Sequence, residues 1–557
     1  MRTIGTFGFV LSFLLLFTVL GTSGLVAADT AVDTTLQVSE TNNTTNNTSD
    51  NTSDDEYTAE DLLQADTEEN ESQTTIGYWE GVRYNDSFSF DEQDEDYLNQ
   101  SEQEKLTRRA IARIEYIRNS TFNQKPTVNI VTRDAYQKGS GGYTQKNGSA
   151  KKWNNIVWKS MFMVDENTNV EAELSKLYGG QVKAFYSPSQ DEVYMIVSES
   201  QTDIVKFQST SLVHELVHAY QDQKFDLDNQ ALQTDTQDAE LSKNSIVEGE
   251  AVYIERQYEE YCESGVWDCY ESNAESTTSG DSIHLGLQLT AFFPYSDGYA
   301  YVDHTLDEGG WNKINNSYND PPTHTSQIIH YNQGVNTETV DVTVDGKRWE
   351  RYSHGANGKE SVGEATLAMM FWYQQNEYGI DTGISDADLT QTTDGSTYNY
   401  NYSVTDNLQG DAVVPITHKT ESNKTGYIFK TQWNADADAT EFKQGYINIL
   451  NGHGATKHST KLTGDVYVIS NESGYTGVYY IEQDGNTLEI TQSSTLSEIK
   501  NIQSIETKTK DVTDRNRIQE FLNTIPLPTI IALILAVLLL IGISTKYLVI
   551  DVWKKQR

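Results

Sequence analysis

Residues 214–218 read His-Glu-Leu-Val-His and lie in an amphipathic stretch, about residues 210–223, that predicts a helix. Positions four apart on a helix share one face and are separated by a rise of about 6 Å, so His214 and His218 should project side by side. Two imidazoles at this spacing can converge on one zinc ion through bonds of about 2.0–2.1 Å. Glu215 would then lie beside the metal, able to take a proton from its bound water. The pattern predicts a zinc site with Glu215 as its catalytic residue.

A zinc site with an open position needs a third protein ligand, and a carboxylate-rich segment follows about thirty residues downstream. In a helix beginning near Ser245, Glu248 and Ala251 share one face, which allows close packing while one carboxylate faces the metal. The side chain of Glu250 points about 200° away around such a helix. The predicted Zn²⁺ ligands are therefore His214, His218 and Glu248, with Glu250 and Glu255 as alternatives.

These two motifs resemble the gluzincin type of metallopeptidase, in which an H-E-x-x-H helix is followed by a helix bearing E-x-x-A. More narrowly, the chain resembles a family of haloarchaeal surface proteins, on the runs HELVHAYQDQKFDL from His214, EGEAVY from Glu248, and an aromatic, Gly- and Pro-rich segment ending at His330. The similarity covers about residues 179–330. The resemblance implies a zinc-binding, peptidase-like core. It does not indicate a substrate.

Peptide hydrolysis also needs a donor that stabilises the developing oxyanion. Spacing alone does not identify this residue, and the candidates come from the segment of family resemblance. The transition-state stabiliser that we name is His330, with His304, His324 and Tyr299 as alternatives.

The expected fold class is α+β, with a zincin-like metallopeptidase domain over residues 76–378 that combines a small sheet with the active-site helices. Helical spacing near residues 103–118 and alternation in 182–186 and 193–197 predict a helix and a hairpin in this domain. After residue 378 the composition changes, and strand-like and helix-like segments predict a smaller α+β module over residues 379–505. A polar stem, residues 506–524, follows.

Both ends of the chain carry hydrophobic segments. Arg2, an apolar run over residues 7–20 and the small residues before Asp29 predict a signal peptide over residues 1–28. Residues 525–545 are long and apolar enough to predict one transmembrane helix. Basic residues in the segment 546–557 place this tail in the cytoplasm, so we expect a single-pass cell-membrane protein with an extracellular ectodomain.

Residues 29–75 are rich in Thr, Asn, Ser, Asp and Glu, a composition that predicts a disordered stalk. Five closely spaced Asn-x-Ser/Thr sequons within residues 42–53 favour a glycosylated spacer. The glycosylation candidates are Asn42, Asn43, Asn46, Asn47 and Asn51. The chain's two cysteines, Cys262 and Cys269, lie close together and predict a small-loop disulfide in an exported protein.

The chain has 82 Asp and Glu against 40 Lys and Arg, a formal net charge of −42. Because the acidic residues are spread along the chain, we interpret this charge as adaptation to molar salt, which screens the repulsion, in a halophilic archaeon. The same charge argues against nucleic-acid binding. The sequence thus predicts a membrane-anchored extracellular zinc metallopeptidase-like protein acting on a peptide or protein substrate; the alternative is a non-catalytic cell-surface binding or structural protein with a stabilising zinc site.

Overall fold

A computed structural model describes residues 75–87, 97–138, 144–197, 204–206, 208–270, 282–344, 347–470, 473–503 and 505. The predicted signal peptide, the candidate glycosylation sites, the polar stem, the segment 525–545 and the cytoplasmic tail all lie outside these residues. So does the stalk, apart from its last residue.

The first half of the described chain is mainly helical. Its helices are α1 (Gln100–Arg118), α2 (Arg133–Lys138), α3 (Gly148–Ser160), α4 (Val170–Gln181), α5 (Ser209–Phe225), α6 (Gln237–Glu263), α7 (Leu285–Ser317) and α8 (Thr325–Ile329), with a 3-10 turn at Gln230–Leu232. Its strands are β1 (Tyr78–Trp79), β2 (Val82–Arg83), β3 (Leu98–Asn99), β4 (Thr127–Thr132), β5 (Ala184–Ser187), β6 (Glu192–Val197) and β7 (Ile204–Val205). The predicted hairpin is confirmed as β5 and β6, which pair antiparallel, and β4 joins β6 in parallel to complete a three-stranded sheet.

Local chemistry fixes the ends of the predicted helices. Helix α1 begins with a capping box, in which the Asn99 side chain accepts from the Glu102 backbone N–H and the Glu102 carboxylate accepts from the Asn99 N–H. Helix α5 ends at Phe225 and is followed by the C-cap residue Asp226, which has φ 56°. The Asp222 carboxylate accepts from the Leu227 N–H beyond this end and also lies 2.8 Å from the Tyr186 hydroxyl of β5. Helix α5 is thereby anchored to the three-stranded sheet.

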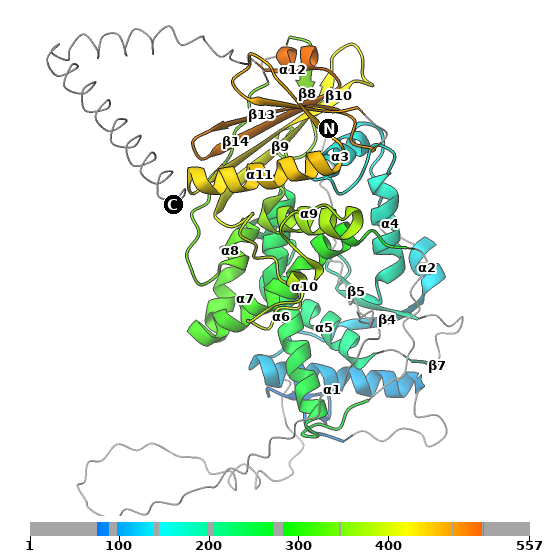
Figure 1. The fold of residues 1–557 in the computed structure, drawn as a ribbon. Helices are drawn as coiled ribbons and strands as arrows, with labels where there is room; N and C mark the ends of the chain where they lie inside the picture. Colours follow the sequence, from blue (N-terminus) through cyan, green and yellow to red (C-terminus); the bar gives the residue numbers. More distant parts are fainter. Residues whose placement is uncertain are drawn as a thin grey trace, which may run out of the picture.

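The second half of the described chain forms a seven-stranded antiparallel sheet with helices beside it. The strands are β8 (Trp349–Arg351), β9 (Leu408–His418), β10 (Thr425–Trp433), β11 (Thr456–His458), β12 (Asp465–Ile469), β13 (Gly477–Asp484) and β14 (Thr487–Ser493), in the order β11-β12-β13-β14-β10-β9-β8. The helices are α9 (Gly363–Tyr378), α10 (Asp386–Leu389), α11 (Asp436–Gly452) and α12 (Leu496–Ile502). Figure 1 shows this sheet and α1 at opposite ends of the molecule, with α5, α6 and α7 between them.

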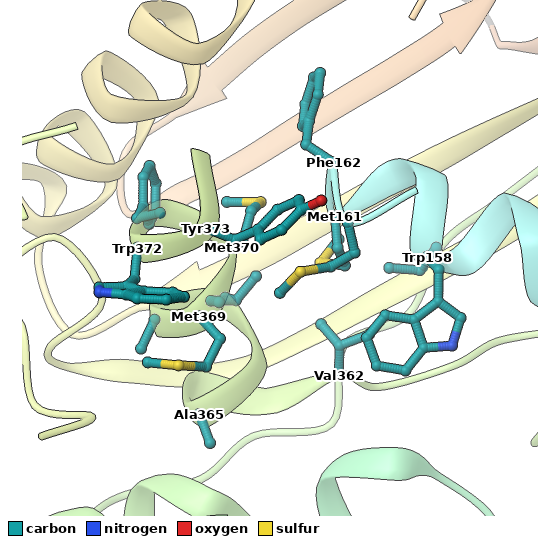
Figure 2. Close-up of a cluster of buried hydrophobic side chains, with 14 of the residues drawn as sticks. Trp158, Met161, Phe162, Val362, Ala365, Met369, Met370, Trp372 and Tyr373 are labelled. Atoms are coloured by element: carbon teal, nitrogen blue, oxygen red, sulfur yellow. The ribbon is translucent and has the colours of Figure 1, made fainter. Parts of the chain in front are cut away.

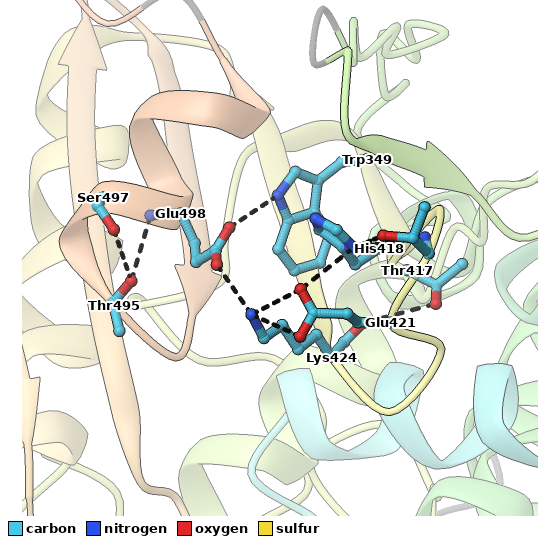
Figure 3. Close-up of polar contacts among 9 residues, drawn as sticks. Trp349, Thr417, His418, Glu421, Lys424, Thr495, Ser497 and Glu498 are labelled. Atoms are coloured by element: carbon cyan, nitrogen blue, oxygen red, sulfur yellow. Dashed lines mark hydrogen bonds and ion pairs between the residues drawn. The ribbon is translucent and has the colours of Figure 1, made fainter.

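The sheet begins before residue 379, where we expected the C-terminal module to start. Strand β8 pairs with β9 at one edge, and the chain builds α9 and α10 before it returns to the sheet at β9. Helix α12 is fixed to this edge through Glu498, whose carboxylate accepts from Trp349 Nε1 at 3.3 Å and from Lys424 Nζ at 3.5 Å (Figure 3). The sheet module, defined here as residues 349–503, therefore encloses α9.

One apolar core joins the sheet module to the first half of the chain. Met161 and Phe162, which follow α3, are fully buried in the same core cluster as Met370 and Tyr373 of α9, and Figure 2 shows Met161 beside Tyr373. The Phe162 carbonyl accepts from Gln374 Nε2 at 2.7 Å. Burial of these large side chains, each worth about 1.5–3 kcal/mol, holds α9 against α3.

The predicted fold class needs correction in two respects. The α+β class stands, but the largest sheet is the seven-stranded one in the C-terminal half, where we expected a smaller module attached to a zincin-like core. We also expected a C-terminal transmembrane helix, whereas no helix within the described ranges is both long and apolar enough to cross a membrane. Helix α7, which is interrupted at Gly310, contains Asp297, Asp303, Asp307 and Glu308, and such charges are costly in hydrocarbon.

Candidate metal centre

Helix α5 presents His214 and His218 on one buried face. Both imidazoles are fully buried, and their ring centroids lie 4.9 Å apart. The Nε2 atom of each ring lies 3.2 Å from the same oxygen of Glu248, Oε2. The ligand atoms of these three residues all lie within 4.8 Å of one another, so the group could hold a metal ion.

Helix α6, which carries Glu248, crosses its neighbour α7 very closely. A Cβ built on Gly249 would lie 2.2 Å from the Gly298 carbonyl oxygen of α7, so neither glycine leaves room for a side chain at the crossing. Helix α6 begins at Gln237, earlier than the expected start near Ser245, because the Thr236 side chain caps it by accepting from the Ala239 N–H. The Glu248 carboxylate therefore projects from the middle of a long helix.

The second nitrogen of each imidazole has a fixed partner. His214 Nδ1 lies 3.0 Å from Oε2 of Glu255, which is about two helical turns beyond Glu248 on α6. His218 Nδ1 lies 2.7 Å from Gln221 Oε1, while the Nε2 of Gln221 donates to the Val247 carbonyl at 2.8 Å. Because Gln221 and Glu255 offer acceptor oxygens, each Nδ1 carries a proton and donates it, which leaves both Nε2 lone pairs facing Glu248.

Because lone pairs on both Nε2 atoms would repel the carboxylate oxygen, this arrangement is favourable only with a positive charge between them, either a proton on an Nε2 atom or a metal ion. Burial lowers the pKa of His214, but Glu248 and Glu255 outweigh it and raise that pKa to about 10. Burial raises the pKa of Glu248, but the charge of His218 and hydrogen bonds from both histidines lower it to about 2. The electrostatics of the group thus favour an ionised carboxylate with a cation beside it.

Glu250, one of the two alternatives to Glu248, faces away from the histidines. It is fully buried, and its Oε1 accepts from Arg118 Nε at 2.6 Å while its Oε2 accepts from the Tyr318 hydroxyl at 2.7 Å. Glu255, the other alternative, contacts His214 through Nδ1. The structure therefore places Glu248 among the potential ligand atoms and Glu255 behind one of the imidazoles.

Glu215, the predicted catalytic residue, follows His214 on α5 and is 1% exposed. Its charge is one of the effects that raise the pKa of His214. The ring of Tyr295 from α7 stacks on the His214 ring, with centroids 6.0 Å apart and an interplanar angle of 17°. Sequence reasoning named neither Tyr295 nor Gln221, although Gln221 follows His218 by three positions and so shares its helix face.

The candidate transition-state stabilisers lie in other contacts. His330 forms a second group of potential metal ligands with Glu364 and Asp406. His304 lies 3.6 Å from Glu308 of its own helix, and the Tyr299 ring lies under the Arg256 guanidinium. His324 precedes α8, where its Nδ1 lies 2.9 Å from the Thr323 hydroxyl.

The two cysteines, Cys262 and Cys269, form a disulfide at the C-terminal end of α6. Arg113 of α1 holds the closed loop, because its Nη2 donates to the Asp268 carbonyl at 2.8 Å and its guanidinium lies over the Trp267 ring. The disulfide therefore fixes the end of the helix that carries Glu248 and Glu255.

A surface cavity of about 770 Å³ lies elsewhere, on the sheet module. Its lining comes from the segments 381–384 and 402–404 and from α11, and includes Asp381, Asp436 and Glu441. It contains no histidine and none of the predicted site residues. The chemistry of the metal centre therefore does not depend on this cavity.

Comparison with known proteins adds one family match. A family described as "Domain of unknown function (DUF8575)" matches residues 350–503, which covers nearly the whole sheet module. No curated protein and no solved structure matches the chain. The matched range contains Glu364 and Asp406 but not α5 or α6, so it does not bear on the group formed by His214, His218 and Glu248.

Proposed function

We propose that the chain is a zinc metallopeptidase-like protein of the gluzincin type, hydrolysing peptide bonds in a peptide or protein substrate. The observation that carries this proposal is the convergence of His214, His218 and Glu248, with Glu215 on the same helix as the histidines. A zinc site built only for stability has no use for a carboxylate beside its ligands.

The donor set suits zinc. Two imidazole nitrogens and one carboxylate oxygen make three protein ligands, the number found in catalytic zinc sites that keep one position open. Magnesium and calcium favour sites made of oxygen ligands alone. Glu255 and Gln221 hold the imidazoles through Nδ1, which is the outer-shell support that histidine ligands of zinc usually have.

When bound, zinc would polarise the substrate carbonyl and make water more acidic. Glu215 then accepts a proton from the attacking water at its carboxylate and passes it to the leaving amine. The bond from the carbonyl carbon to the amide nitrogen breaks as a bond to the water oxygen forms, giving a carboxylate and an amine. Glu255 and Gln221 keep His214 and His218 in place throughout.

The proposed location is outside the cytoplasm, on the cell surface. The Cys262–Cys269 disulfide supports it, because disulfides persist in oxidising compartments. The net charge of −42 supports an environment of molar salt, as for a halophilic archaeon.

Burial favours one rival function, a surface binding or structural protein in which zinc only stabilises the fold. The exposed fractions of His214, Glu215, His218 and Glu248 are all between 0% and 3%. A peptide substrate would need α7 or a neighbouring element to move before it reached Glu215. The rival function needs no such movement.

The deciding experiment compares the full chain with its Glu215→Gln and His218→Ala variants in molar NaCl. Zinc content is measured by mass spectrometry, and cleavage of a pool of unstructured peptides is followed in parallel. The proposal expects Glu215→Gln to retain zinc and to lose at least about 100-fold in cleavage rate, the usual contribution of a general base. It expects His218→Ala to lose one zinc ion per chain.

The rival function expects a different result. Zinc-loaded wild-type chain would cleave no peptide, and Glu215→Gln would change nothing measurable. Removal of zinc would still lower the melting temperature, because an ion that binds only the folded state stabilises it.

A further inference from the structure

His330, Glu364 and Asp406 form a second group of potential metal ligands, separate in sequence from α5 and α6. His330 Nε2 lies 2.9 Å from Glu364 Oε1 and 3.5 Å from Asp406 Oδ1. One ligand atom from each residue lies within 4.8 Å of the others. We infer that these three residues bind a divalent transition-metal ion that fastens the sheet module to the helical half of the chain.

Because this group is buried, a hydrogen bond between His330 and Glu364 does not satisfy all of its polar atoms. Glu364 is fully buried and His330 is 5% exposed. Among the described residues, neither the second oxygen of Glu364, Oε2, nor the second nitrogen of His330, Nδ1, has a hydrogen-bond partner. A buried carboxylate oxygen without a partner costs free energy, and a metal ion at the group would remove that cost.

Further carboxyl groups surround the three residues. Asp297 of α7 and Asp238 of α6 are both buried near Glu364. When ionised, the carboxylates of Glu364 and Asp406 together carry two negative charges, which one divalent cation balances.

The donor set identifies the class of metal. One imidazole with two carboxylates suits Mn²⁺ or Zn²⁺, whereas calcium and magnesium favour oxygen ligands alone. The Asp406 side chain is 42% exposed, so solvent can complete the coordination and an ion can enter from that side. The proposed ligand is therefore a first-row divalent transition metal.

The three ligands come from three separate segments. His330 directly follows α8, and its N–H donates to the Ser326 carbonyl. Glu364 lies in the first turn of α9, and Asp406 lies in the turn that leads into β9. An ion at this group would connect α8 to both helix α9 and strand β9 of the sheet module. The role of this ion would be structural. The inference does not rest on the proposed peptidase activity.

The test uses the full chain in molar NaCl, stripped with a chelator and reloaded with Mn²⁺, Zn²⁺ or Ca²⁺. Ions per chain are counted by mass spectrometry, affinities are measured by calorimetry, and melting temperatures by circular dichroism. The variants are Asp406→Asn and His330→Gln, with Asp484→Asn, an exposed aspartate at the end of β13, as the matched control. His218→Ala removes a ligand of the first group and isolates the second.

With Mn²⁺ or Zn²⁺, we expect His218→Ala to keep one ion that Asp406→Asn and His330→Gln bind at least about tenfold more weakly. Loading should raise the melting temperature of His218→Ala but not of its double variant with Asp406→Asn. Wild-type affinities for every ion in Asp406→Asn and His330→Gln would overturn the inference, and so would retention of Ca²⁺ alone. Peptide cleavage does not enter this test, so it can fail while the proposed function holds.

Discussion

Gly249 of α6 and Gly298 of α7 lie in backbone contact. A Cβ on Gly249 would lie 2.2 Å from the Gly298 carbonyl oxygen, and a Cβ on Gly298 would lie 2.5 Å from the Ser245 carbonyl oxygen. Since side-chain carbons do not approach backbone atoms so closely, only glycine fits at either position. This contact sets the separation of the two helices next to Glu248.

Gly249→Ala should therefore destabilise the protein. Overpacking a tight contact costs about 1–3 kcal/mol, and here the clash is with backbone that cannot rotate away. The free energy of unfolding, measured by denaturant titration in molar salt, should fall by about this amount. The matched control is Gly179→Ala in α4, where a Cβ would meet nothing within 4 Å and helix propensity favours alanine. Equal stability of the two variants would contradict the close crossing.

Glu255→Gln should weaken metal binding without removing a ligand. The Glu255 carboxylate accepts from His214 Nδ1 at 3.0 Å and so holds the imidazole with Nε2 toward Glu248. Loss of such a partner typically lowers metal affinity about 10–100-fold. Competition titration with a zinc chelator measures the change, and Glu260→Gln, at an exposed position on the same helix, serves as control. An unchanged affinity would mean that Glu255 does not orient His214.

Replacement by glutamine should affect stability at Glu250 and metal binding at Glu248. Glu250→Gln removes the charge that pairs with buried Arg118, and breaking a buried pair costs about 3–5 kcal/mol. Its metal stoichiometry should nevertheless match that of the wild type. Glu248→Gln should lose the ion bound by His214 and His218, as seen by metal analysis. If Glu250→Gln lost that ion while remaining folded, the assignment of Glu248 would be wrong.

His453 should make stability depend on pH below neutrality. Burial lowers its pKa from 6.5 to about 4, and its Nε2 lies 2.6 Å from Gln374 Oε1. Because the neutral ring is favoured in the folded state, its contribution is complete above about pH 6.5 and is lost as the pH falls toward 4. The difference corresponds to roughly 3 kcal/mol.

Denaturant titrations at several pH values between 7 and 4 test this expectation. The slope of unfolding free energy against pH should be smaller in His453→Gln than in the wild type. His458→Gln, at an exposed position in β11, should keep the wild-type slope. Parallel curves for the wild type and His453→Gln would show that His453 does not titrate differently on folding.

The sequence was informative where a pattern is local. The helix expected over residues 210–223 is α5, and the relation between Glu248 and Ala251 correctly separated the direction of Glu248 from that of Glu250. The close contact that α6 makes through Gly249 was not predicted. Its partner Gly298 lies on another helix, so no local sequence pattern connects the two glycines. The extent of α6 was also underestimated, since its start depends on a single capping hydroxyl.

Contacts between distant segments were the least accessible to sequence reasoning. No periodicity connects His330 with Glu364 and Asp406, which lie on segments that only the tertiary fold brings together. The sequence did not predict the early start of the sheet module for the same reason. Strand β8 has three residues, and only pairing with β9 identifies it.

Phe162 couples the unfolding of the two halves of the chain. It follows α3, yet its ring stacks on His453 beyond α11, and its carbonyl accepts from both Gln374 and Tyr475. Because these partners all belong to the sheet module, that module cannot melt without exposing the same buried ring to water. Calorimetry should therefore record one cooperative transition for the described chain, and a cut between α8 and β8 should leave two fragments that need each other to fold.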